Sequence, residues 1–169
     1  MELIKADISD LYSLQALSIR TFTETFADDN SSTDIVKYLR ESFATAKLFR
    51  ELSNPFTEFY LIRSEAKPIA YLKLNSGNAQ SEPMGNESLE LERIYILKEF
   101  QGNGSGQLLM DKVIEIARKK KVKYIWLGVW ENNHRALSFY KKYGFEVYGQ
   151  HIFQFGNDPQ TDLLMRLFL

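Results

Sequence analysis

The sequence predicts a fold of the α/β (α+β) class, in which a mixed, mostly antiparallel central sheet is flanked by helices. Segments with strand periodicity and with helix periodicity follow one another along the whole chain. The order strand, glycine-rich turn, helix, strand between Leu89 and Val129 forms a βαβ-like unit, so its two strands should be parallel. A hairpin signal at 57–74 predicts antiparallel pairing elsewhere in the sheet.

The first half of the chain is predicted to hold a short strand, helices and the hairpin. Asp7 or Ser9 caps a helix that ends near Phe26, because apolar residues recur at helical spacing after them. A polar turn separates this helix from a second one, which opens at Thr33 or Asp34. The other elements expected here are a strand at 1–5, a helical piece at 46–52, and strands at 57–63 and 68–74 that are joined by the turn 64–67.

The second half contains the βαβ-like unit and two closing strands. A loop rich in Gly, Asn, Ser, Gln and Pro at 75–88 precedes an apolar strand at 89–97. The amphipathic helix after the glycine-rich turn ends in lysines 119–121. We interpret this run as cations at the negative C-terminal end of a helix dipole rather than as a nucleic-acid-binding patch. The other expected elements are a strand at 124–129, a helix at 133–143 and strands at 145–155 and 162–169.

Length and composition indicate one globular domain spanning residues 1–169. Lys and Arg number 21 against 22 Asp and Glu, so no global charge points to a nucleic acid or an anionic membrane as partner. We find neither a signal-peptide pattern nor an apolar run of bilayer-spanning length, and we expect a soluble, cytoplasmic protein. There is no cysteine, so acyl transfer through a cysteinyl intermediate is excluded.

The segment QGNGSG at 101–106 follows a strand and opens a helix, where unpaired backbone N–H groups and the helix dipole attract a phosphate. It lacks the Gly-Lys-Ser/Thr ending of a nucleotide-hydrolysing P-loop, and its glycine spacing does not fit the dinucleotide fingerprint. Taken alone, the hexamer is equally compatible with a plain glycine-rich turn.

Two motifs in order give a specific resemblance. Q-x-x-G-x-G at 101–106 resembles the pyrophosphate-binding signature of the GNAT superfamily of N-acetyltransferases. ENNHRALSFYKKYGF at 131–145 is similar to the downstream N-x-x-A-x-x-x-Y-x-x-x-G-F segment of the same superfamily. By this resemblance the chain is identified as a member of the GNAT superfamily. The order of elements matches over the whole chain, and the residues specific to the superfamily lie within 89–145.

The resemblance implies the GNAT acyl-CoA N-acyltransferase fold and an enzyme that moves an acetyl group from acetyl-CoA to an amine, by direct attack in a ternary complex. Residues 98–142 carry ten Lys or Arg against four Asp or Glu, which suits the phosphates of coenzyme A. The cofactor-binding residues that we expect are Ile94, Tyr95, Ile96, Gln101, Gly102, Asn103, Gly104, Ser105, Gly106, Gln107, Asn133, Tyr140 and Lys142.

A narrower resemblance points to the acceptor. The segments AQSE at 79–82, LELERIYI at 89–96, IWLGVWE at 125–131 and QTDL at 160–163 resemble those of bacterial spermine/spermidine N-acetyltransferases. This resemblance implies a polyamine, spermidine or spermine, as the small-molecule amine substrate.

The strand at 89–97 carries two further signals. Its aliphatic positions change parity between Leu91 and Ile94, as an inserted β-bulge residue would cause, although burial of both faces is an alternative. The resemblance implies that backbone groups freed here bind the pantetheine arm and polarise the thioester carbonyl. Glu90 and Glu92 share one face of the strand, and we favour Glu92 as the general base. The alternative for either carboxylate is an ion pair with Arg93 or another cation, and this alternative suits Glu90 better.

Tyr140 matches the tyrosine whose hydroxyl, by the resemblance, protonates the departing CoA thiolate; a plain core position is the alternative. A phenol with an ordinary pKa of about 10 carries that proton at neutral pH. Asn133 is expected to cap the helix at 133–143. The resemblance implies that its amide also contacts coenzyme A.

Residues 1–45 carry eight acids against four bases, and an acidic acceptor side would attract a polycationic amine, although solvated helix faces also carry such charge. The acids named for this side are Glu24, Asp28, Asp29, Asp34 and Glu41. The substrate-site candidates are Phe22, Phe26, Tyr38, Glu41 and Glu92, where the aromatic residues serve equally well as core.

His134 and His151 have no partner at ligand spacing, so we interpret both as ordinary polar positions and expect no metal. Two other functions stay open: acetylation of a protein N-terminus or lysine, and a non-catalytic acyl-CoA-binding sensor. The sequence also leaves the oligomeric state open, a homodimer included.

Overall fold

The computed structural model describes all 169 residues and contains one seven-stranded sheet in the order β1-β2-β3-β4-β5-β7-β6. The strands are β1 (Glu2–Lys5), β2 (Thr57–Ser64), β3 (Lys67–Asn75), β4 (Ser88–Ile96), β5 (Tyr124–Trp130), β6 (Glu146–Phe155) and β7 (Asp158–Phe168). The helices are α1 (Leu11–Phe26), α2 (Ser32–Ser42), α3 (Thr45–Ser53), α4 (Ser105–Lys119) and α5 (His134–Lys142). Short 3₁₀ turns cover Ile8–Asp10, Ala27–Asp29, Gly77–Ala79 and Lys98–Phe100.

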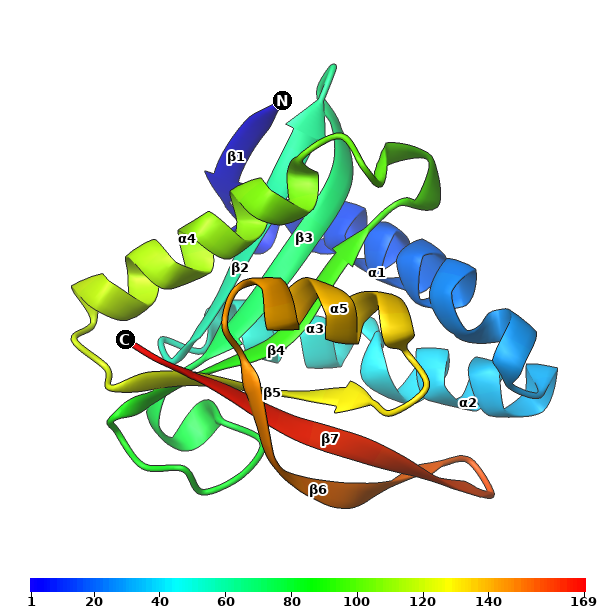
Figure 1. Cartoon of the computed structure of the whole chain (residues 1–169). Coiled ribbons are helices and arrows are strands. Elements are labelled where there is room, and N and C mark those ends of the chain that lie inside the picture. Colours follow the sequence, from blue (N-terminus) through cyan, green and yellow to red (C-terminus); the bar gives the residue numbers. More distant parts are fainter.

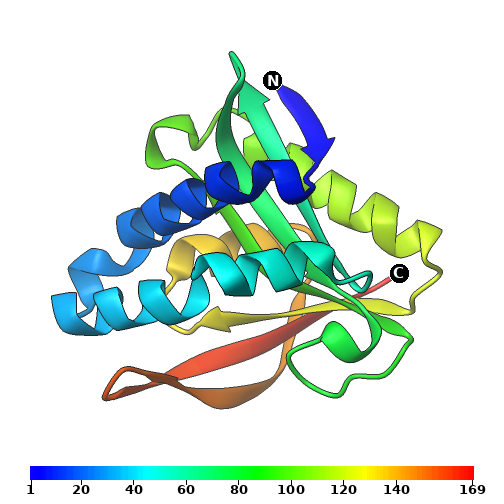
Figure 2. The ribbon, with the colours of Figure 1, turned by 180° about the vertical axis from the view of Figure 1, so that it is seen from behind.

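Helices cover both faces of the sheet. Helices α4 and α5 lie on one face (Figure 1), and α1, α2 and α3 lie on the other (Figure 2). Each helix buries one stripe, as amphipathic periodicity requires: Leu14 and Leu17 of α1 and Leu109 and Val113 of α4 are almost fully buried. The predicted mixed α/β architecture is confirmed. None of the helices combines the length and the apolar composition that crossing a lipid bilayer requires.

The predicted pairings are confirmed. Strands β2 and β3 form the antiparallel hairpin, and β4 and β5 are the only parallel neighbours in the sheet. The predicted bulge is also present: Lys73 pairs with Arg93 and Leu74 with Leu91, so Glu92 is the inserted residue. Because the bulge inserts one residue, the inward-facing positions change parity across it.

Strands β4 and β5 separate after a short parallel stretch. They pair only from Ser88–Tyr124 to Glu90–Trp126, although β4 continues to Ile96 and β5 to Trp130. Beyond Glu90, the edge of β4 that faces β5 therefore has no ladder partner. The opening lies at the centre of the sheet, beside the start of α5 (Figure 1).

The last hairpin differs from the prediction. Strand β7 begins at Asp158, whereas we expected the strand to start at Asp162. Strand β5 pairs with β7 only from Asp162 onward, so Pro159 lies on a two-stranded ribbon. Proline is tolerated there, since no third strand needs its missing N–H.

Candidate active site

Two adjoining cavities occupy the opening between β4 and β5. The glycine-turn cavity, of about 500 Å³, lies against the start of α4, and the aromatic cavity, of about 360 Å³, lies toward α1, α2 and the β6–β7 ribbon. They share five lining residues: Ile94, Tyr95, Asn133, Ala136 and Tyr140. A molecule bound in one cavity therefore meets a molecule bound in the other at Tyr140.

The glycine turn leaves the N-terminus of α4 uncovered. Gly102 and Gly104 have φ of 85° and 91°, and no atom lies within 4 Å of where a Cβ would be, so the turn is open above its backbone. The first backbone bond of the helix runs from Leu108 N–H to Gly104 O. The amides of Gly106 and Gln107 precede that bond and so lack a partner within the helix, and both residues line the glycine-turn cavity.

The structure brings most of the predicted cofactor residues together around the glycine-turn cavity. Asn103 and Ser105 are the exceptions, because the Asn103 side chain accepts from both the backbone N–H and the hydroxyl of Ser105, and Ser105 is buried. These two residues stabilise the turn through their mutual hydrogen bonds and do not line the cavity. Sequence reasoning missed other lining residues: Thr25, Arg135, Ala136, Ser138 and Phe139.

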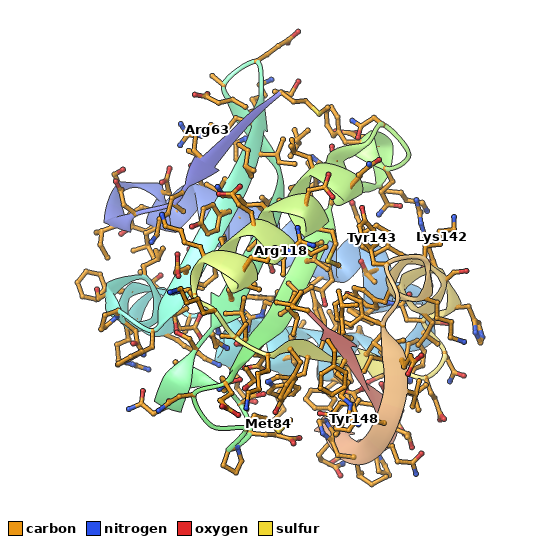
Figure 3. The ribbon with its side chains drawn as sticks, turned by 60° about the vertical axis from the view of Figure 1, so that its left-hand side comes forward. Arg63, Met84, Arg118, Lys142, Tyr143 and Tyr148 are labelled. Carbon is orange, nitrogen blue, oxygen red and sulfur yellow. The ribbon has the colours of Figure 1, made fainter.

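Gln101 holds the glycine turn against its neighbours. Its side-chain amide donates to the Ile96 carbonyl at 3.0 Å, and its oxygen accepts from Arg135 of α5. At the other end of α5, Lys142 also lines the cavity, and Figure 3 shows it at the surface beside Tyr143. The two cations, Arg135 and Lys142, place positive charge along one wall, as a polyphosphate ligand requires.

Tyr140 lies at the junction of the two cavities. The side chain is buried, and burial raises the pKa of the phenol above its ordinary value. The hydroxyl therefore keeps its proton at neutral pH. The hydroxyl makes no hydrogen bond within the protein. Asn133 caps α5 as predicted, since its side chain accepts from the Ala136 N–H at 3.2 Å.

The bulge residue Glu92 is held by two buried cations. Its carboxylate lies 2.6 Å from Lys73 Nζ and 3.5 Å from Arg93 Nη2, and Asn75 donates to it at 2.5 Å. Although burial opposes the charge, these cations lower the pKa of Glu92 to about 2. A carboxylate with so low a pKa is a weak proton acceptor near neutral pH.

Glu90, unlike Glu92, forms no ion pair. It accepts from the Ser81 N–H at 2.8 Å, from the Ser81 hydroxyl and from Asn75 at 3.0 Å, and burial raises its pKa. The expectation that Glu90 is the carboxylate paired with a cation is therefore wrong. The bulge decides this, because it moves Glu92 into reach of Lys73 on β3.

Aromatic side chains form one wall of the aromatic cavity. Phe22 and Tyr38 stack with ring centroids 4.2 Å apart, and Phe26 packs against Phe22 at 4.7 Å, so these three candidates are both core and lining residues. Glu41 is exposed and does not line the cavity. The other rings of the wall belong to Tyr95, Trp126, Trp130, Phe153 and Phe155.

Of the carboxylates that line the aromatic cavity, only Glu92 was a substrate-site candidate. They belong to Glu82, Glu90, Glu92 and Asp162, whereas none of the acids of residues 1–45 lines it. Glu24, for example, accepts from the Lys98 N–H and pairs with Arg20 instead. The charge of the N-terminal helices therefore does not make the acceptor side acidic.

His151 is not the ordinary polar position that we expected. It lies in β6 and lines the aromatic cavity, with Nδ1 2.6 Å from Glu82 and Nε2 3.5 Å from Asp162. The spacing of 69 residues to Glu82 gives no local signal. The register His151–Asp162 in the β6–β7 hairpin was the only sequence feature that could have indicated one of these contacts.

A pH-dependent stability follows from Glu92. Its folded-state pKa of about 2 lies below the ordinary value of 4.5, so its contribution is fully present above pH 4.5 and is lost as the pH falls toward 2. We expect Glu92→Gln to lower the free energy of unfolding at pH 7 and to change it much less at pH 3, measured by urea titration at both pH values. An equal loss at both pH values would contradict this.

The comparisons with known proteins agree with this geometry. Residues 14–145 match the acetyltransferase (GNAT) family, and the chain belongs to that family. It is 36% identical over 98% of its length to an uncharacterized N-acetyltransferase of Lactobacillus delbrueckii subsp. lactis, of which it covers 96%. It is 33% identical over 38% of its length to the spermine/spermidine N(1)-acetyltransferase of Bacillus subtilis, of which it covers 43%.

A solved structure shows the same fold with coenzyme A. The PaiA N-acetyltransferase of Thermoplasma acidophilum, in complex with coenzyme A, superposes on this chain with a TM-score of 0.83 at 25% sequence identity. The superposition covers 99% of this chain and 98% of the PaiA chain. The open glycine turn, the amides of α4 and the cations of α5 fit such a ligand. The protein is an acetyl-CoA-dependent N-acetyltransferase.

Proposed function

We propose that the acceptor is a primary amine of a polyamine such as spermidine or spermine, bound in the aromatic cavity. The observation that carries this proposal is the charge of that cavity: four carboxylates line it, and its only Lys or Arg is Arg93, which lies beside Glu92. Glu82, Glu90 and Asp162 have no Lys or Arg partner within ion-pair distance. Their negative charge favours a ligand with several ammonium groups.

The aromatic wall supports the same ligand class. Faces of Tyr, Trp and Phe attract alkylammonium groups, and rings also cover the methylene segments between them. Phe22, Tyr38 and Phe155 form a stacked group at one end, with centroid separations of 4.2 to 6.1 Å. A linear chain of methylene segments and ammonium groups matches a cavity that is lined by both rings and carboxylates.

The partial likeness to the spermine/spermidine N(1)-acetyltransferase of Bacillus subtilis also favours a polyamine. It covers 38% of this chain, so the charge and the shape of the cavity carry more of the argument.

In the reaction that we propose, acetyl-CoA supplies an activated acetyl thioester. The unpaired edge of β4 at Ile94 and Tyr95 borders both cavities, where its backbone N–H groups are suited to polarise a carbonyl. Tyr140 presents a protonated hydroxyl at the junction and gives its proton to the leaving sulfur. Glu92 stays ionised between Lys73 and Arg93 and holds the bulge in place rather than taking a proton.

A panel of amines tests the acceptor. We expect spermidine and spermine to support acetyl-CoA-dependent thiol release with a higher kcat/KM than butylamine, which has one ammonium group and engages fewer carboxylates. Peptides with a free N-terminus or an internal lysine are the comparison set, and a no-acceptor reaction is the control. Preference for butylamine or for the peptides would refute the polyamine proposal, while the family membership would stand.

A further inference from the structure

His151 is the one titratable imidazole in the aromatic cavity, and the proposed reaction has so far given it no role. It projects from β6, where it pairs in register with Asp162 of β7. The loop between β3 and β4 brings Glu82 to its other side. In Figure 3, Met84 of that loop and Tyr148 of β6 mark the lower edge of the molecule, where the two segments lie close together.

The contacts of His151 select one tautomer. Nδ1 lies 2.6 Å from Glu82 Oε1, the distance of a charge-assisted hydrogen bond, so Nδ1 carries the hydrogen and donates it. In the neutral imidazole, Nε2 then holds the free lone pair. Nε2 lies 3.5 Å from Asp162 Oδ2, too far for a strong bond, so that lone pair is free to accept a proton.

Strand β5, which is separated from β6 by β7, leaves the imidazole accessible. Gly128 of β5 lines the same cavity, and a Cβ there would lie 3.7 Å from Asp162 Oδ2 and 3.9 Å from His151 Cε1. A side chain at this position would therefore contact the ring. Because residue 128 is glycine, the imidazole edge borders the cavity, with its side chain 35% exposed.

Glu90 and Glu92 compare poorly with His151 as proton acceptors. Glu92 is neutralised by Lys73 and Arg93. Both oxygens of Glu90 already accept hydrogen bonds from Ser81 or Asn75, and the residue is 3% exposed. An imidazole with a free nitrogen is the side chain whose proton affinity suits general-base catalysis near pH 7.

We propose that His151 Nε2 is the general base that takes the proton from the acceptor ammonium, directly or through one cavity water, and that Glu82 is the positioning residue for the ring. The ammonium loses one proton to Nε2, and the freed nitrogen lone pair forms the new C–N bond as the C–S bond of the thioester breaks. The sulfur receives its proton from the Tyr140 hydroxyl, and the second amine proton restores Tyr140 through cavity water. The imidazolium releases its proton to solvent after turnover.

The inference builds on the proposed function only in placing an amine acceptor in the aromatic cavity. The groups that surround His151 are Glu82 from the loop before β4 and Asp162 from β7, with Glu90, Glu92 and Arg93 of β4 and Tyr140 of α5 also lining the cavity. Two carboxylates beside the ring stabilise the imidazolium that forms during proton transfer.

The test compares the two histidines of the chain. We expect His151→Gln to lower kcat/KM for the best amine about 100-fold at pH 7. It should also remove the rising limb of the pH profile of kcat/KM, which reports the essential base of the free enzyme. His134→Gln is the matched control, because His134 is exposed on α5 and lines neither cavity, and its profile should equal that of the wild type.

A structural role for His151 would not produce chemical rescue. We expect added imidazole to restore part of the turnover of His151→Ala but none of Tyr140→Phe, with coenzyme A affinity by calorimetry unchanged in both. Glu82→Gln should reduce kcat less than His151→Gln and keep the pH limb. An unchanged limb in His151→Gln, or a limb lost in Glu90→Gln instead, would overturn the assignment; absence of turnover with any amine in the wild type would count against the proposed function.

Discussion

Replacement of Tyr140 by Phe is expected to lower kcat by about 100-fold while leaving the affinity for acetyl-CoA nearly unchanged. The substitution removes one oxygen from the junction of the two cavities and keeps the ring that packs against Phe139 and Phe145. Because the hydroxyl has no hydrogen-bond partner within the protein, its loss leaves no buried group unsatisfied. Steady-state thiol release and calorimetry with coenzyme A measure the two quantities.

Tyr143→Phe is the matched control for this prediction. Tyr143 lies on the same helix end and makes an aromatic contact with Phe139, but it lines neither cavity. It should therefore retain wild-type kcat. If Tyr140→Phe also kept full turnover, the proton of the leaving thiol would have to come from water, and Tyr140 would have only a packing role.

Replacement of Lys73 by Met should lower the free energy of unfolding by about 3 kcal/mol. The Lys73 ammonium, 5% exposed, lies 2.9 Å from Glu51 and 2.6 Å from Glu92. Methionine fits the space of the alkyl chain but leaves two largely buried carboxylates with Arg93 as their only cation. Removal of one partner of a buried ionic group costs more than the group contributes as a whole.

Lys123→Met is the control, since Lys123 forms an equally short ion pair with Glu87 at 2.7 Å but both side chains are about two-thirds exposed. Surface pairs of this kind contribute about 0 to 1 kcal/mol. Urea unfolding at pH 7 measures both variants. Equal stability losses in the two would show that burial of the Lys73 cluster has no energetic consequence.

The local features of this protein could be predicted from its sequence. The order of strands and helices follows from periodicity and turn residues, and the parallel β4–β5 pair follows from the glycine-rich turn and helix between them. The bulge was visible as a parity change within β4 itself. Most residues of the glycine-turn cavity were also predictable, because they lie in two short segments of chain.

The polar contacts inside the site could not be predicted in the same way. We expected Glu92 to be the base and Glu90 to pair with a cation, but the bulge exchanges their environments by bringing Glu92 to Lys73 on the next strand. The acids of residues 1–45 were compatible with an acidic acceptor side or with solvated helix faces, whereas the aromatic cavity takes its carboxylates from the β3–β4 loop, β4 and β7, and only Glu92 among them was a substrate-site candidate.

The sequence by itself therefore determined the elements, their order and the glycine-rich turn that we expect to bind phosphate, because these depend on residues that are neighbours along the chain. Only the tertiary structure decided which charges face one another. Glu82 meets His151 across 69 residues because the β3–β4 loop folds against the β6–β7 ribbon. Such a contact depends on strand order and register in three dimensions, and no periodicity along the chain encodes it.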